Sequence, residues 1–326
     1  CLASPLRDVY KRQNKINATE DVELVGKSMI RVGMDKPQIS KILKCSLLLH
    51  KKEIKITEDK VYLGCYCKLN ILYKGEDSKE IIPLEDDIYL SKEEEINGIT
   101  SDMIPTVSYE ISNNDLMLEE DDLGEIRIIN DELVVRANVK IFSKENIDTI
   151  KDAYSTNCLL SLKKDEHEVG ILHGMNNSEA IVKYNIQLKD NDLRPEHIIS
   201  ANGAIILTDK QVVKDRVIVE GIIKASILYK TTDEEKYLSS VKAEIPFSAA
   251  IDIAGADENM KSIIKSNLEN IEAAIEGNNI AIKATVILSG RVLYEMNKEF
   301  VSDVVEEEGD IPEKKASITI YLSLIH

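Results

Sequence analysis

Two stretches of the chain, 156 residues apart, carry nearly the same apolar pattern. "KVYLGCYCKLNILYKGED" (60–77) lies over "RVIVEGIIKASILYKTTDE" (216–234), so that "ILYK" falls on "ILYK". Three more blocks recur in the same order: "IYL" (88–90) over "IPF" (245–247), "INGITSDM" (96–103) over "IAGADENM" (253–260), and "LVVRANVKI" (133–141) over "IAIKATVIL" (280–288). Solenoid proteins repeat every 20–50 residues or so. The much longer spacing found here predicts two copies of one domain.

Inside these blocks, apolar residues occupy every second position. In 61–71 all the odd positions are apolar: Val61, Leu63, Cys65, Cys67, Leu69 and Ile71. A period of two is typical of a strand with one face against a core. Gly, Asn and Asp gather between the runs, where tight turns are expected. The sequence therefore predicts an all-β chain of two tandem, mostly antiparallel β-sandwich-like modules with few short helices.

One segment and the chain ends need separate interpretation. Residues 257–277 have apolar spacing compatible with an amphipathic helix, but their counterpart contains Pro105 and alternates like a strand, so we expect strands in both. We expect 1–17 to be a non-native or disordered N-terminal extension. The two β domains are expected at 18–157 and 158–313, and 314–326 is expected to be a truncated linker.

The charge and the cysteines limit the possible partners and the compartment. A net charge of −17 repels nucleic acid and anionic membrane surfaces, so we expect no nucleic-acid partner. No stretch approaches the roughly 20 apolar residues that span a bilayer, so no membrane insertion is expected. Five cysteines without framework spacing, and no secretory signal, favour a reducing compartment.

The sequence offers few candidates for chemistry. "VGKS" (25–28) resembles the end of a phosphate-binding loop, but the glycine required five residues before Gly26 is Asp21. Cys65 and Cys67 would share one strand face, as a metal or redox pair could, but the second copy has Gly221 and Ile223 there. We interpret these cysteines as small core residues. The five histidines form no ligand pair, so no catalytic, cofactor-binding or metal-ligating residue is predicted, and no cofactor or enzymatic activity.

Tyrosines are the remaining candidates. Sugar-binding modules usually present flat aromatic side chains, and this chain has twelve Tyr but no Trp. Tyr73 and Tyr229 repeat at matching positions, and we interpret them as packing residues at strand ends.

The repeated blocks resemble the SPOCS domain of clostridial spore-coat proteins. The motifs that carry the resemblance are "KDRVIVEGIIKASILY" (214–229), "AEIPFSAAIDI" (243–253) and "NIAIKATVIL" (279–288), with a more divergent first copy. Tandem SPOCS domains followed by "EEEGDIPEKKASITIY" (306–321) are similar to the SipL family of coat and cortex morphogenesis proteins. That family continues into a C-terminal LysM domain, which we expect to be missing after 314–326.

The resemblance implies a non-enzymatic scaffolding protein of endospore coat and cortex assembly. The implied partners are a SpoIVA-like coat morphogenetic ATPase, contacted mainly through the LysM domain, and other coat proteins. The implied location is the mother-cell cytoplasm at the forespore surface, or the spore coat. The alternative is a cell-envelope glycan-binding module, which would need an exposed row of tyrosines and would bind peptidoglycan. A hydrolase would need a carboxylate pair at equivalent places in both copies, and none is evident.

Overall fold

The computed structural model describes residues 6–77, 80–152, 159–189, 192–233 and 235–307 as a chain built of strands. Residues 1–5, which include Cys1, and residues 314–326 lie outside the described residues, as does Cys158. The strands are β1 (Leu6–Arg31), β2 (Ile39–Thr57), β3 (Lys60–Gly75), β4 (Ile81–Glu95), β5 (Ile104–Glu120), β6 (Ile126–Asp152), β7 (Leu159–Gln187), β8 (Pro195–Val213), β9 (Arg216–Thr231), β10 (Leu238–Asp252), β11 (Lys261–Glu276) and β12 (Asn279–Glu307).

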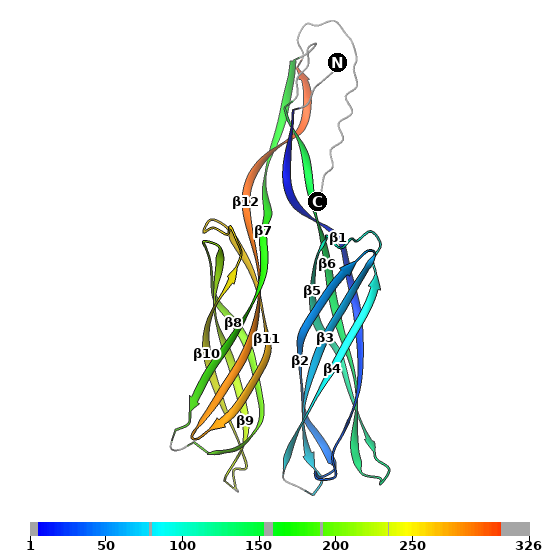
Figure 1. Ribbon diagram of the computed structural model, residues 1–326, viewed down its shortest axis with the longest axis vertical. Helices are drawn as coiled ribbons and strands as arrows, with labels where there is room; N and C mark the ends of the chain where they lie inside the picture. Colours follow the sequence, from blue (N-terminus) through cyan, green and yellow to red (C-terminus); the bar gives the residue numbers. More distant parts are fainter. Residues whose placement is uncertain (1–5, 78–79, 153–158, 190–191, 234, 308–326) are drawn as a thin grey trace.

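The twelve strands form two six-stranded sandwiches with the same topology (Figure 1). In the first, the sheet β1-β6-β5 packs against β2-β3-β4; in the second, β7-β12-β11 packs against β8-β9-β10. All the neighbouring pairs are antiparallel. The predicted all-β, tandem sandwich-like fold is confirmed. The described residues contain no helix, and 261–276 forms the strand that we expected.

The alternation read from the sequence gives each sandwich its core. The odd positions of 61–71 in β3 are fully buried, and so are 133–141 at odd positions in β6. The matching positions of β9 and β12 fill the second core. The core of each sandwich is therefore filled largely by aliphatic side chains from its two central strands, as expected for two sheets packed face to face.

The repeated "NGI" and "AGA" loops have the same structural role in both sandwiches. In the first, Asp59 adopts a positive φ between β2 and β3, and its carboxylate accepts a hydrogen bond of 2.6 Å from Gly98 N. In the second, Asp215 does the same and accepts a hydrogen bond of 2.8 Å from Gly255 N. Both glycines have φ near +80°, which favours a residue without Cβ. The repeated motif thus closes one end of each sandwich.

The first sandwich has a longer β5–β6 hairpin than its counterpart. Ile111 lies opposite Val135, 24 residues later, whereas Leu268 lies opposite Val286, only 18 residues later. The additional residues surround the turn at 121–125. This extension adds a second small apolar cluster to the first sandwich, around Tyr73 and Ile129.

The sandwiches lie side by side and are joined at one end (Figure 1). The paired ends of β1 and β6, and of β7 and β12, extend beyond the sandwiches as two long arms. Residues 6–17, which the sequence analysis assigned to an N-terminal extension, form the start of β1. Near the end of the sandwiches from which the arms extend, the Arg291 guanidinium of β12 lies 5.9 Å from the ring centroid of Phe142 of β6. Between β2 and β11, Lys51 N donates to Glu269 Oε1 (2.6 Å) and Lys52 Nζ donates to Asn267 Oδ1 (2.9 Å).

In the part of the chain described here, we find no helix with the length and apolar content needed to cross a membrane.

Candidate functional site

The paired cysteines of β3 lie in the core of the first sandwich. Cys65 and Cys67 are completely buried among aliphatic side chains and are free thiols. Burial raises the pKa of Cys65 to about 11 and that of Cys67 to about 12. Among the described residues, no cluster of three or more His, Cys, Asp or Glu could hold a metal ion. These thiols act as small core residues.

The two thiols should therefore resist alkylation in the folded chain. The thiolate is the reactive form, and burial with a raised pKa leaves it almost unpopulated at pH 8. We expect iodoacetamide at pH 8 to leave Cys65 and Cys67 unmodified until urea unfolds the chain, as measured by mass spectrometry. The partly exposed Cys45 serves as the internal comparison. Labelling of Cys67 as fast as Cys45 would contradict this placement.

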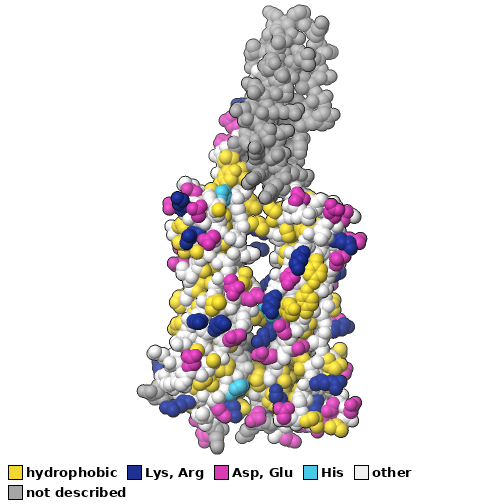
Figure 2. All heavy atoms as spheres, in the orientation of Figure 1, with side chains coloured by type: hydrophobic (Ala, Val, Ile, Leu, Met, Phe, Trp, Pro, Cys, Tyr) yellow, Lys and Arg dark blue, Asp and Glu magenta, His cyan; other side chains and the backbone are white. Residues whose placement is uncertain are grey.

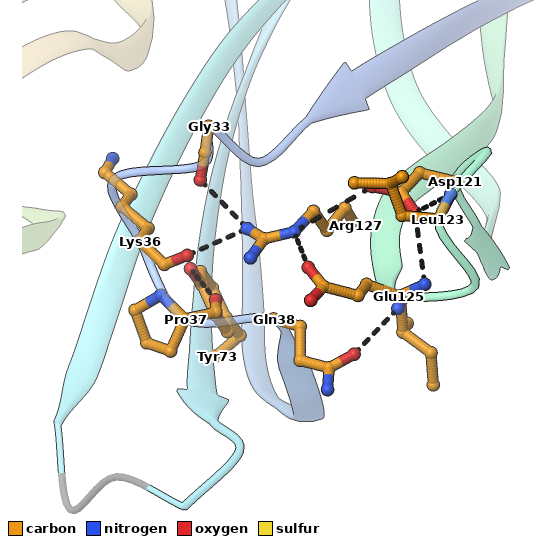
Figure 3. Close-up of polar contacts among 10 residues, drawn as sticks. Gly33, Lys36, Pro37, Gln38, Tyr73, Asp121, Leu123, Glu125 and Arg127 are labelled. Atoms are coloured by element: carbon orange, nitrogen blue, oxygen red, sulfur yellow. Dashed lines mark hydrogen bonds and ion pairs between the residues drawn. The ribbon is translucent and has the colours of Figure 1, made fainter.

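Tyr73 and Tyr229 anchor the loops that lead into β2 and β8, at equivalent places in the two sandwiches. Both rings are buried, and their hydroxyl groups donate to the carbonyls of Pro37 (3.0 Å) and Leu193 (3.2 Å), each 36 residues upstream. Figure 3 shows the contact of Tyr73 with the loop between β1 and β2. These tyrosines are packing residues, and neither presents its ring to solvent.

Arg127 holds the same loop against the extended hairpin (Figure 3). Its side chain is largely buried, and Nη1 donates to the carbonyls of Gly33 (3.0 Å) and Lys36 (2.8 Å). Its Nε donates to Glu125 Oε2 at 2.5 Å, and Asp121 Oδ2 lies 3.9 Å away. In the second sandwich, Asn278 Nδ2 donates to Leu188 O (3.3 Å), which is a weaker version of this link. The network is a structural clamp.

The other sequence candidates do not form a site. Gly26 of "VGKS" lies within β1, where an added Cβ would approach Ile88 and Leu90 to 2.9 Å, so this glycine permits close packing of the sheets. His173 is hydrogen-bonded to the carbonyl of Ala254 (2.9 Å). His50 differs, because it lies beside the partly exposed ring of Tyr66, which in turn lies beside the exposed ring of Tyr89.

An aromatic strip, made of Tyr62, Tyr66, Tyr89 and His50, follows the outer face of β2-β3-β4. His50, Tyr66 and Tyr89 lie in one cross-strand row. The Tyr66 ring lies 4.8 Å from that of Tyr89 and 5.6 Å from that of His50, between centroids. The Tyr89 hydroxyl reaches over Gly64 to the hydroxyl of Tyr62, to which it is hydrogen-bonded. The four rings therefore form one continuous surface.

Charged side chains border the strip in pairs that neutralise each other. The pairs are Lys60–Glu93 (2.6 Å), Lys68–Glu85 (3.0 Å) and Lys55–Glu53 (3.5 Å), and His50 Nε2 is hydrogen-bonded to Asp87 Oδ1 (2.8 Å). The ammonium of Lys51 lies 5.1 Å from the Tyr66 ring centroid, and that of Lys55 lies 5.9 Å from the Tyr62 ring centroid. Figure 2 shows apolar and aromatic side chains gathered on this face, next to basic and acidic groups.

The strip leads into a cleft between the two sandwiches. The cleft has a volume of about 600 Å³ and is lined from the first sandwich by Ser46, Lys68, Asn70 and Glu85, among others. From the second sandwich, β8 contributes Asn202 and β11 contributes Asn270 and Glu272. Figure 2 shows the surface hollowed between the sandwiches. The cleft walls offer amide, hydroxyl and carboxylate groups for hydrogen bonding.

The second sandwich lacks the strip. The row that corresponds to His50, Tyr66 and Tyr89 consists of Ile206, Ile222 and Pro246. Tyr62 corresponds to Ile218 in the same register. Because both copies have the same sheet in the same place, the tyrosines are a property of the first copy and not a requirement of the fold.

A buried carboxylate is a second special feature of the first sandwich. Asp131 of β6 is 2% exposed, and among the described residues neither of its oxygens has a hydrogen-bond partner. Burial, and then the charges of Asp86 and Asp115, raise its pKa to about 6. Asp131 lies opposite Ser28 and Leu116, and the residue in the same place in β12 is Ile282, opposite Tyr184 and Ala273.

Sequence reasoning missed both of these features. The even positions of 61–71 pointed away from the core and included Tyr62 and Tyr66, which was the available signal. Their contact with Tyr89 depends on the pairing of β3 with β4. Asp131 lies two residues before Leu133, on the inward phase of that alternation, but its charged side chain gave no reason to extend the apolar block to it.

Two segments of the chain match a known protein family. The model of the family described as "SipL, SPOCS domain" matches residues 38–119 and 195–276, which together make up half of the chain. The two matches begin at the entries to β2 and β8 and end in β5 and β11, at equivalent places in the two sandwiches. No match was found among curated proteins or among solved structures.

Proposed function

The chain belongs to the SipL family, as a protein with two SPOCS domains and a relation to sporulation, and on this premise we propose that it is a non-enzymatic scaffolding protein of spore coat and cortex assembly. It acts through contacts with other coat proteins, including a SpoIVA-type morphogenetic ATPase. It does so from the mother-cell side of the forespore surface. The observation that carries this proposal is the pair of SPOCS matches in one chain.

Features of the structure support a role in binding and not in chemistry. The closest pair of thiols is buried in a core with raised pKa values. The two tyrosines that repeat between copies are hydrogen-bonded to backbone carbonyls. The broad outer sheet faces and the cleft between sandwiches provide surfaces for contacts.

The test follows the protein and the coat together in a spore-forming host. A fluorescent fusion of the gene should form a shell around the forespore. Deletion of the gene should give forespores whose coat is detached or misplaced in electron micrographs. Purified SpoIVA-type ATPase should bind the protein in a pull-down, more weakly when a LysM domain is lacking, because the resemblance places the main contact there.

The fluorescent protein alone is the control for localisation, and restoring the gene should restore the coat. A diffuse mother-cell signal together with a normal coat in the deletion strain would refute the scaffolding role.

A further inference from the structure

The aromatic strip and the cleft form one continuous surface along β3. The rows Lys55–Tyr62–Glu93 and His50–Tyr66–Tyr89 are followed along the sheet by Leu48–Lys68–Asp87 and Ser46–Asn70–Glu85. Residues of the last two rows line the cleft. From Tyr62 to Asn70 the strand extends about 26 Å, at roughly 3.3 Å per residue. The surface is therefore suited to an extended ligand.

The second sandwich forms the far wall of this surface. Lys51 lies over the Tyr66 ring and donates its backbone N–H to Glu269 of β11. The strip is thus directly linked to the contact between sandwiches. Asn202 and Asn270 then face the first sandwich across the cleft.

We propose that the aromatic strip and the cleft bind a linear, uncharged polysaccharide chain, with pyranose rings stacked on the tyrosines and hydroxyl or acetamido groups bonded to the cleft walls. Pyranose rings present apolar C–H faces, which pack on aromatic rings, and a polar perimeter. The surface complements both features. Its aromatic rings can pack against the C–H faces, and the amide, hydroxyl and carboxylate groups of the cleft can form hydrogen bonds with the polar perimeter.

The charges of the protein favour an uncharged ligand over an anionic one. The chain has a net charge of −17, which repels a polyanion. Lys55, Lys60 and Lys68 are each paired with a carboxylate, so these three ammonium groups do not form a free anion site.

A structural role for Tyr89 alone does not account for the strip. Its ring covers Gly64, where an added Cβ would meet the Tyr89 hydroxyl at 2.9 Å. That role would explain one tyrosine. Tyr62 and Tyr66 stand where the second sandwich has Ile218 and Ile222, and that sandwich keeps the same fold.

The test uses the complete chain and defined saccharides. Cellohexaose and chitohexaose are titrated by calorimetry, and insoluble chitin is used in a co-sedimentation assay. Saturable binding of at least one of the three is expected. Preference for chitohexaose or chitin over cellohexaose would indicate recognition of acetamido groups. Because the chain contains no Trp, a change in tyrosine fluorescence should accompany binding.

Variants identify the site. The double variant Tyr62→Ile/Tyr66→Ile gives the first sandwich the residues of the second, so it should fold, with a melting temperature close to that of the original chain. We expect it to bind roughly tenfold more weakly or worse. Asn70→Ala should weaken binding from the cleft end. The matched control is Tyr184→Ile, which removes a 39% exposed tyrosine of the second sandwich outside the strip.

Three outcomes would overturn the proposal. They are the absence of binding to all three saccharides, equal binding by the original chain and the double variant, and an equal loss in Tyr184→Ile. Loss of binding to the SpoIVA-type ATPase in the double variant, with no saccharide binding by the original chain, would assign the strip to a protein partner instead.

Discussion

Replacing Arg127 by methionine is expected to lower the free energy of unfolding of the first sandwich by about 3 kcal/mol. Methionine keeps much of the side-chain volume, but it leaves the carbonyls of Gly33 and Lys36 without the guanidinium donor. Glu125 also loses its ion pair. Because Arg127 is only 8% exposed, water cannot easily replace these contacts. Urea unfolding followed by circular dichroism measures the change, and amide hydrogen exchange assigns it to the first sandwich.

Arg136→Met is the matched control for this substitution. Arg136 is in the same strand, but its side chain is 51% exposed and pairs with Glu23 at 3.5 Å. Exposed ion pairs contribute at most about 1 kcal/mol. If Arg127→Met costs no more than Arg136→Met, the clamp between the hairpin and the β1–β2 loop does not stabilise the domain.

Replacing Asp131 by asparagine is expected to stabilise the first sandwich at neutral pH. In the unfolded chain, the Asp131 carboxyl group loses its proton near its ordinary pKa of 3.8, but in the folded chain only near pH 6. Between these values the folded state binds more protons, so the contribution of Asp131 to stability is complete below pH 4 and is lost as the pH rises through 6. The shift corresponds to nearly 3 kcal/mol, which solvent screening reduces to about 2 kcal/mol.

The difference between the original chain and Asp131→Asn should therefore be about 2 kcal/mol at pH 7.5 and close to zero at pH 4, in urea unfolding at both pH values. Glu132→Gln is the control, because Glu132 is the next residue in β6 and forms an exposed ion pair with Lys27 (2.8 Å). This control should change stability by less than about 1 kcal/mol. A pH-independent gain in Asp131→Asn would show that the buried carboxylate does not titrate as described.

The alternation of apolar residues was enough to predict the fold. In β3 and β9 each inward position is apolar, and a strand has only two faces, so the pattern identifies the buried one. The duplication then implied that 257–277 is a strand, since its counterpart contains Pro105. The apolar spacing of that segment was also compatible with a helix, and the tandem repeat correctly favoured the strand.

The register of the last repeated block could not be obtained in this way. The sequence match placed 133–141 over 280–288, but strand pairing places Val135 and Val286 in the same position, opposite Ile111 and Leu268. The structural match is therefore displaced by four residues. A shift by an even number leaves the inward face unchanged, so the apolar pattern cannot detect it. The longer hairpin at 121–125 shortens the spacing between the copies by six residues, from 157 to 151, whereas the sequence match implied a shortening to 147.

The candidate site was only partly predictable for a related reason. The sequence showed that Tyr62 and Tyr66 lie on the outward face of their strand. An exposed row of tyrosines was also the feature that the glycan-binding alternative required. The third ring comes from β4, and the cleft comes from packing between sandwiches. Neither local pattern nor repetition contains information on such contacts.

The two arms determine how the molecule would respond to tension. The start of β1 pairs with the end of β6 in one arm, and the end of β12 pairs with the start of β7 in the other. A pull applied between Leu6 and Glu307 would therefore peel β1 from β6 and β12 from β7 within the arms, one hydrogen-bonded pair after another. It would not shear a whole ladder at once, so the arms would yield before either sandwich bears load.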